Sequence, residues 1–161
     1  MNRLRHPPMS SLELKIPPPV VALIAATLMW LVSGGIPALE AVGLLNLAIV
    51  ILLAVAGAGC DILALLAFYR AKTTINPMKP GATSAMVTGG IYGVTRNPMY
   101  VGLVLFLGAW AAYLWSWWPL LGPVAFVFYI SRFQIAPEEK VLTEKFGQDY
   151  LRYRAKVRRW I

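Results

Sequence analysis

Residues 44–69, LLNLAIVILLAVAGAGCDILALLAFY, form an apolar stretch that is interrupted only by Asn46 near one end and by Asp61. A helix rises about 1.5 Å per residue, so about 20 apolar residues cross the roughly 30 Å hydrocarbon core of a bilayer. This stretch is longer than that minimum. It therefore predicts a transmembrane helix with enough length to tilt.

Three further apolar stretches lie on either side of it, at about residues 20–39, 99–114 and 117–130. The first follows three prolines, Pro17 to Pro19, which suit a helix start, while Gly34, Gly35 and Pro37 loosen its far end. The last two are short and are separated by a tryptophan-rich turn, so we expect a tight hairpin. The pattern predicts an all-α integral membrane bundle with about four transmembrane helices.

The composition agrees with a membrane protein. Of the 161 residues, 58% are hydrophobic and 14% are charged, whereas about 25% of residues are charged in ordinary soluble domains. The net charge of +8 is better suited to anionic lipid headgroups than to nucleic acid in such a chain, and we expect no nucleic-acid partner. One cysteine, Cys60, and one histidine, His6, cannot form an intrachain disulfide or a histidine-based metal site.

The basic residues predict the topology. Of the fifteen Lys and Arg residues, three precede the first stretch, four lie between the second and third, and eight follow the fourth. The expected outer loops, at 33–43 and around Trp115, contain none. Positive charges remain on the cytosolic side of short loops, so we expect both termini in the cytosol of a cell with a bacterial or archaeal type of cytoplasmic membrane. The tryptophans around Trp115 then lie at the opposite interface, as an aromatic anchor would.

This topology divides the single membrane domain, residues 1–161, into five parts: a basic N-terminal segment (1–19), two transmembrane helices (20–69), a cytosolic loop (70–98), a transmembrane hairpin (99–131) and a cytosolic C-terminal helix (132–161). Pro137 is expected in the first turn of that last helix. Leu142, Phe146, Tyr150 and Tyr153 recur at spacings of 4, 4 and 3, which predicts an amphipathic helix with one apolar face. That face needs a partner, either the membrane interface or the cytosolic ends of the spans.

Several residues are candidates for chemistry, and each has an alternative structural role. The glycine-rich segment before Pro98 places Arg96 at a helix start, where amide groups can meet an anion; Arg96 is otherwise a topology determinant. Glu138 and Glu139 either bind a cationic ligand or complement the dipole at a helix start. Asp61 is costly in lipid, so it should face the bundle interior and find a hydrogen-bond donor, for either a functional or a structural reason.

The C-terminal 90 residues resemble the isoprenylcysteine carboxyl methyltransferase and phospholipid methyltransferase superfamily of membrane enzymes. The resemblance rests on TTINP at 73–77, GIY at 90–92, RNPMYVG at 96–102, EE at 138–139 with the aromatic residues that follow, and VRRW at 157–160. The better-known form of the family has a histidine where this chain has Asn97. Asparagine donates and accepts hydrogen bonds but does not titrate, which argues against proton transfer at this position.

The resemblance implies a cytosol-facing pocket for S-adenosylmethionine, covered by the C-terminal helix, with a lateral opening for a lipophilic or small methyl acceptor. Membrane lipid is the expected partner. The acceptor group is open between a carboxylate, an amine and a thiol. The resemblance assigns catalytic roles to Arg96 and Glu139, and cofactor binding to Tyr92, Asn97, Pro98, Tyr100, Glu138, Glu139, Tyr153 and Arg159.

Two other functions remain open from the sequence. Membrane reductases that use a nicotinamide cofactor have a similar C-terminal layout, although this chain is short for that class. A non-enzymatic protein could also use its basic tail to hold anionic lipid headgroups.

Overall fold

The computed structural model describes residues 13–35, 37, 43–72 and 85–161. Regular structure in these ranges is helical, and they contain no β-strand; Thr95 and Arg158 form an isolated parallel bridge. The elements are α1 (Pro18–Ser33), α2 (Leu44–Arg70), the 3₁₀ turn η3 (Gly90–Gly93), α3 (Pro98–Tyr113), the 3₁₀ turn η4 (Trp118–Leu120), α4 (Leu121–Ile130), the π-helical segment η5 (Ser131–Ile135), α5 (Ala136–Phe146) and α6 (Gln148–Lys156).

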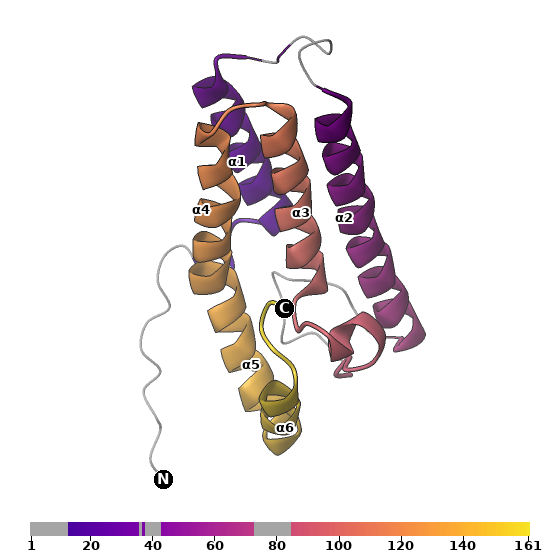
Figure 1. Cartoon of the computed structure of the whole chain (residues 1–161). Coiled ribbons are helices and arrows are strands. Elements are labelled where there is room, and N and C mark those ends of the chain that lie inside the picture. The colour runs from indigo at the N-terminus through magenta and orange to yellow at the C-terminus, as the bar shows by residue number, and fades with distance from the viewer. Residues whose placement is uncertain (1–12, 36, 38–42, 73–84) are drawn as a thin grey trace.

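Helices α1 to α4 lie side by side as a bundle, with α5 and α6 below it in the view of Figure 1. Helix α3 is central: it packs against α2 on one side and against α1 and α4 on the other. The end of α2, the start of α3 and the C-terminal segment meet at the lower end of the bundle (Figure 1). The candidate residues for catalysis and cofactor binding lie at this end.

The interior between α1, α3 and α4 is filled by apolar side chains. Met29, Leu107, Phe126 and Ile130 are almost fully buried there. Met29 lies so close to Gly122 that any β-carbon on this glycine would collide with its sulfur atom, so the glycine permits the close approach of α1 and α4.

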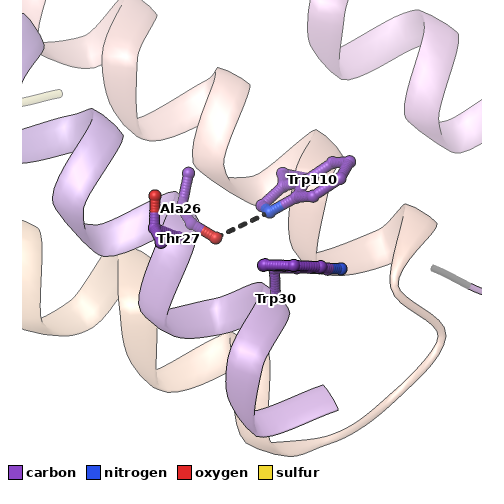
Figure 2. Close-up of a pocket in the computed structure, with 4 residues that line it drawn as sticks. All are labelled: Ala26, Thr27, Trp30 and Trp110. Atoms are coloured by element: carbon purple, nitrogen blue, oxygen red, sulfur yellow. Dashed lines mark hydrogen bonds between the residues drawn. The ribbon is translucent and has the colours of Figure 1, made fainter. Parts of the chain in front are cut away.

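Two side chains fasten the neighbouring helices to α3 near its C-terminal end. Asn46 Nδ2 donates to the Ala112 carbonyl at 2.7 Å, which explains a buried polar residue in α2. Trp110 Nε1 donates to the Ala26 carbonyl at 3.0 Å and connects α1 (Figure 2). Each bond satisfies a polar group that would be costly in an apolar surrounding.

Two helical stretches are long and apolar enough to cross a membrane: Leu44–Arg70, with a mean hydropathy of 2.6, and the continuous run Trp118–Phe146, with 1.3. Helices α1 and α3 have 16 residues each, which corresponds to about 24 Å of helix. On α2, Leu52, Val55 and Leu63 are more than half exposed. Such a surface suits lipid as its solvent.

The expected boundaries of the second and third apolar stretches are confirmed to within one residue by α2 and α3. The first helix was expected to reach about residue 39, and this is wrong: α1 ends at Ser33, because Gly34 takes a left-handed conformation (φ 81°) that stops the helix. Residues 38–42 of the expected stretch lie outside the described residues.

Pro137 was expected in the first turn of a separate cytosolic helix, and this is wrong. Helix α4 ends at Ile130 only in the sense that its α-helical geometry changes there: the helix continues through η5 into α5, and Pro137 lies inside this continuous run. A proline ring clashes with the carbonyl four residues before it in a regular α-helix, and the wider π turn just ahead of Pro137 relieves that clash.

The single C-terminal helix that was expected is instead two. Gly147, at φ 51° and ψ −124°, separates α5 from α6, and after α6 the chain is extended at Val157. The stripe from Leu142 to Tyr153 is therefore not one helical face. Tyr150 is buried, whereas Leu142 and Phe146, on the other side of the break, are half-buried.

Candidate active site

A carboxylate between two arginines forms the centre of the candidate site. Glu139, on α5, accepts two hydrogen bonds from Arg159: Nε to Oε1 at 3.0 Å and Nη2 to Oε2 at 2.6 Å. Arg96 Nη1 lies 2.9 Å from the same Oε1. The side chains of Arg96 and Glu139 are 9% and 10% exposed, and that of Arg159 is 38% exposed. One negative charge is thus shared by two positive charges in a mostly buried place.

Arg96 retains an unused donor. Its Nη1 also donates to the Tyr150 hydroxyl at 3.3 Å, but its Nε is buried and has no hydrogen-bond partner among the described residues. A buried donor without an acceptor is unfavourable, so this atom indicates where an anionic or polar ligand atom would be stabilised.

The main chain around Arg96 is held by the C-terminal segment. Arg96 N donates to the Arg158 carbonyl at 3.0 Å, and Asn97 Nδ2 donates to the Arg159 carbonyl at 2.8 Å. The Thr95 hydroxyl donates to that same carbonyl at 3.2 Å. This pairing brings Arg159 to Glu139 although the two are twenty residues apart. Asn97 is therefore a structural donor here, in agreement with the doubt about a proton-transfer role.

Beside this centre, Glu138 contacts α3. Its Oε1 accepts from the Tyr100 hydroxyl at 2.7 Å and from Gln134 Nε2 at 2.6 Å. The expected alternative for this pair of glutamates, complementing the dipole at a helix start, loses its basis because α5 continues η5 without a break and has no free N-terminus at Ala136. Both carboxylates are instead held by specific side chains.

Tyr92 and Tyr153 connect η3 to α6. The Tyr153 hydroxyl donates to the Tyr92 carbonyl at 2.6 Å, and the Tyr92 ring packs edge-on against Phe68 of α2, with ring centroids 5.5 Å apart. Burial raises the pKa of both phenols, and it also raises the pKa of Tyr150, where nearby Glu139 adds to the effect. All three phenols therefore remain neutral hydrogen-bond donors around neutral pH.

The Arg159 guanidinium has a pKa above its usual value because its hydrogen bonds to the Glu139 carboxylate favour the charged form. Arg159 therefore carries its positive charge toward the Glu139 carboxylate.

The structure places all the sequence-predicted residues at one end of the bundle, but not in one contact set. Arg96, Glu139 and Arg159 touch one another; Tyr100 joins Glu138; Tyr92 joins Tyr153; Pro98 is buried at the start of α3. Tyr150 and Gln134 also lie at this end of the bundle, although neither was predicted as a site residue. The sequence contains one hint for Gln134, which is a polar residue one helical turn before Glu138.

A hollow of about 190 Å³ lies elsewhere, lined by Ala26, Thr27, Trp30 and Trp110 (Figure 2). Trp110 is near the C-terminal end of α3, whereas Arg96 precedes its start, so this hollow is at the opposite end of the bundle from the charged cluster. The indole Nε1 of Trp110 already donates to Ala26. The lining offers chiefly ring surface and no charged group.

The family model described as phospholipid methyltransferase matches residues 45–149, a range that includes almost all of α2, Arg96 and both glutamates but not Arg159. An uncharacterized protein of Haemophilus influenzae is 48% identical over 63 residues, which are 39% of this chain and the whole of that protein. No solved structure matches the chain. The chain belongs to the phospholipid methyltransferase family.

Proposed function

We propose that this chain is an S-adenosylmethionine-dependent methyltransferase of the cytoplasmic membrane that modifies a lipophilic acceptor at the cytosolic face. The observation that carries the proposal is the carboxylate of Glu139 between Arg96 and Arg159. Family membership supports a methyltransferase with a lipid substrate, and the charged cluster adds a place for the methyl donor.

The residues present fit the amino-acid end of this cofactor, which carries one ammonium and one carboxylate. Glu139 offers the negative charge for the ammonium. Arg159 and the buried Nε of Arg96, which lacks a partner in the described part of the chain, offer donors for the carboxylate. In the structure these opposite charges satisfy each other. A bound zwitterion can replace this pairing: its ammonium pairs with Glu139 and its carboxylate pairs with the arginines, so no charge is left unpaired.

When bound, the cofactor would supply a methyl group on a positively charged sulfur, whose bond to the methyl carbon breaks as the acceptor's lone pair forms the new bond, so that the sulfur leaves as a neutral thioether. The protein's contribution is orientation and exclusion of water. Arg96 is the residue placed to orient the reacting end, since it precedes the first turn of α3 and its side chain is 9% exposed. The neutral phenols of Tyr92, Tyr150 and Tyr153 provide ring surface next to the same cluster.

The membrane arrangement in this proposal has four helices across the bilayer and both termini in the cytosol. Helix α2 and the helical run Trp118–Phe146 are long enough to cross the bilayer. Helices α1 and α3 pack beside them with their axes in roughly the same line (Figure 1). At the other end of the bundle Trp115, Trp117 and Trp118 are exposed, as an interfacial aromatic belt requires. In this proposal the chain keeps the five divisions predicted from the sequence, with α4 and α5 joined in one continuous helical run.

The test is thermal unfolding of the detergent-solubilised protein with S-adenosylhomocysteine and, separately, with NADPH. A ligand at one hundred times its dissociation constant stabilises the folded state by about 2.7 kcal/mol. We expect S-adenosylhomocysteine alone to raise the melting temperature, and the Glu139→Gln variant to lose the response. A rise with NADPH alone would favour a reductase, and no rise with either, together with salt-sensitive binding to anionic vesicles, would favour a lipid-binding protein.

Asp149→Asn is the matched control. Asp149 lies on α6, pairs with Arg152 and is 65% exposed, so the same loss of charge occurs away from the cluster. The response to S-adenosylhomocysteine should be unchanged in this variant. A response lost in both variants would mean that the general charge of the tail, and not Glu139, is responsible.

A further inference from the structure

The carbonyl of Phe133, in the π segment η5, lacks the donor that a regular α-helix would give it. In such a helix a carbonyl accepts from the amide four residues later, and for Phe133 that residue is Pro137, which has no N–H. A carbonyl without a donor is unfavourable away from water. Here the Leu14 amide donates to the Phe133 carbonyl at 3.1 Å. A main-chain group from the segment before α1 thus takes the place of the amide that the proline lacks.

The turn that brings Leu14 to η5 covers residues 13–15 and is held at a second point. Glu13 Oε1 lies 3.1 Å from Arg132 Nη1, and the Glu13 side chain is 14% exposed. The Arg132 guanidinium also lies over the Phe133 ring, 5.5 Å from its centroid. Two neighbouring residues of the turn therefore contact two neighbouring residues of η5.

Leu14 takes an unfavourable main-chain conformation in this turn. Its φ is 56°, in the left-handed region that residues with a β-carbon rarely adopt. Such a conformation persists only where the surroundings hold it, and it is often found where a function depends on it. Glycine would adopt it without strain. The contacts with η5, rather than the preference of its own sequence, therefore hold the turn in place.

The π segment is connected to both sides of the charged cluster. Gln134 Nε2 donates to Glu138 Oε1 at 2.6 Å, and Glu139 follows in the same helical run. On the other side, the Trp160 indole donates to the Ser131 hydroxyl at 3.3 Å and so ties the C-terminal segment to η5. A change in the helical turn at η5 would therefore move the Glu139 carboxylate relative to the two arginines with which it pairs.

We propose that the turn at residues 13–15 is a positioning element of the methyl-donor site: the Leu14 amide and the Glu13 carboxylate fix the helix at η5, and this sets the Glu139 carboxylate between its two arginines. The inference rests on the proposed methyltransferase function and adds a part of the chain outside the residues that the family model matches. Both residues contact η5, so they act on the charged cluster through α5.

The experiment measures the Kd of S-adenosylhomocysteine by isothermal titration calorimetry of the full-length protein in detergent, together with the melting temperature without ligand. Leu14→Pro removes the amide N–H, and its φ of about −65° does not fit the turn. Its Kd should rise at least about fivefold, because the arrangement that binds the ligand is less populated without this hydrogen bond. Leu14→Gly is the matched control. It loses the same side chain, keeps the amide and suits the left-handed conformation, so its Kd should equal the wild-type value.

Charge reversal provides a second test, which also serves if Leu14→Pro does not fold. Glu13→Arg places two positive charges together and should raise the Kd. Adding Arg132→Glu restores an opposite pair and should bring the Kd back toward the wild-type value. Asp149→Arg reverses an exposed charge on α6 and should leave the Kd unchanged.

A purely structural role for the turn predicts a lower melting temperature for ligand-free Leu14→Pro with an unchanged Kd, and this result would overturn the inference. An equal rise in Kd for Leu14→Gly would also overturn it, as would a Glu13→Arg variant that Arg132→Glu does not rescue. In each of these cases, binding of S-adenosylhomocysteine by the wild-type protein leaves the proposed function standing. A wild-type protein that does not bind S-adenosylhomocysteine would overturn the proposed function and this inference with it.

Discussion

Replacement of Glu139 by glutamine tests the charged cluster directly, through the stability of the ligand-free protein. The change keeps the size of the side chain and one acceptor oxygen, but leaves Arg96 and Arg159 without their counter-charge. Removing one partner of a buried ion pair costs about 3–5 kcal/mol, and the pair with Arg96 is of this kind, with side chains 9% and 10% exposed. The pair with Arg159 counts for less, because that side chain is 38% exposed and partly screened by solvent.

Two features lower the cost toward the bottom of that range. Arg96 keeps the Tyr150 hydroxyl as an acceptor, and the glutamine oxygen can accept from one guanidinium. We therefore expect a loss of about 3 kcal/mol. In a chain of this size 1 kcal/mol corresponds to about 2–4 °C in melting temperature, so the expected fall is about 6–12 °C.

The assay is thermal unfolding at fixed detergent and protein concentration, without ligand. Asp149→Asn is again the control, and because surface pairs contribute about 0–1 kcal/mol its melting temperature should change little. The double variant Arg96→Gln with Glu139→Gln should lose less than the sum of the single variants, since the two residues share one interaction. A melting temperature for Glu139→Gln within about 2 °C of the wild type would refute the argument that this carboxylate neutralises a buried arginine.

Three further outcomes are expected. Arg96→Lys keeps the charge but loses the planar guanidinium, so the protein should still insert and bind S-adenosylhomocysteine, with lower affinity because the Nε donor is lost, while kcat falls at least about tenfold; turnover near the wild-type value would leave Arg96 as a topology determinant only. Asn97→Ala removes the donor to the C-terminal main chain, which should cost about 1–3 kcal/mol and speed tryptic cleavage of the tail; an unchanged cleavage rate would contradict the role given to this amide. In a background whose native cysteine is replaced by serine, a membrane-impermeant reagent applied outside intact cells should label a cysteine at position 35 but not one at position 82, and labelling at 82 would rule out the proposed orientation.

The sequence predicted the helices where one physical rule decides them. The length and apolarity of residues 44–69 predicted α2, and Pro98 predicted the start of α3, because a proline suits the first turn of a helix. The same reasoning failed at Pro137. The π segment before Pro137 is what accommodates this proline inside a helix. A π turn cannot be recognised from the spacing of apolar residues.

The candidate site was predicted as a set of residues but not as a set of contacts. The bidentate pairing of Arg159 with Glu139 depends on the chain turning back after α6 and on the bridge between Thr95 and Arg158. Such long-range pairing depends on the packing of the whole bundle and has no local signal. The direction of Asp61 toward the bundle interior could be predicted from the cost of a charge in lipid, whereas its contact with Gly102 of α3 could not, because nothing in the sequence aligns α2 with α3.

The π segment η5 has a consequence for how relatives of this chain should be aligned. A π turn contains one residue more than an α-turn, and it absorbs that residue locally, so the helix on either side keeps its orientation. A relative with one residue fewer between Ser131 and Ile135 could therefore keep both glutamates in place on an uninterrupted α-helix. The same single-residue gap after Ala136 would turn the following residues by about 100° around the helix axis. A one-residue gap within η5 is therefore compatible with the proposed site, whereas a one-residue gap after Ala136 is not.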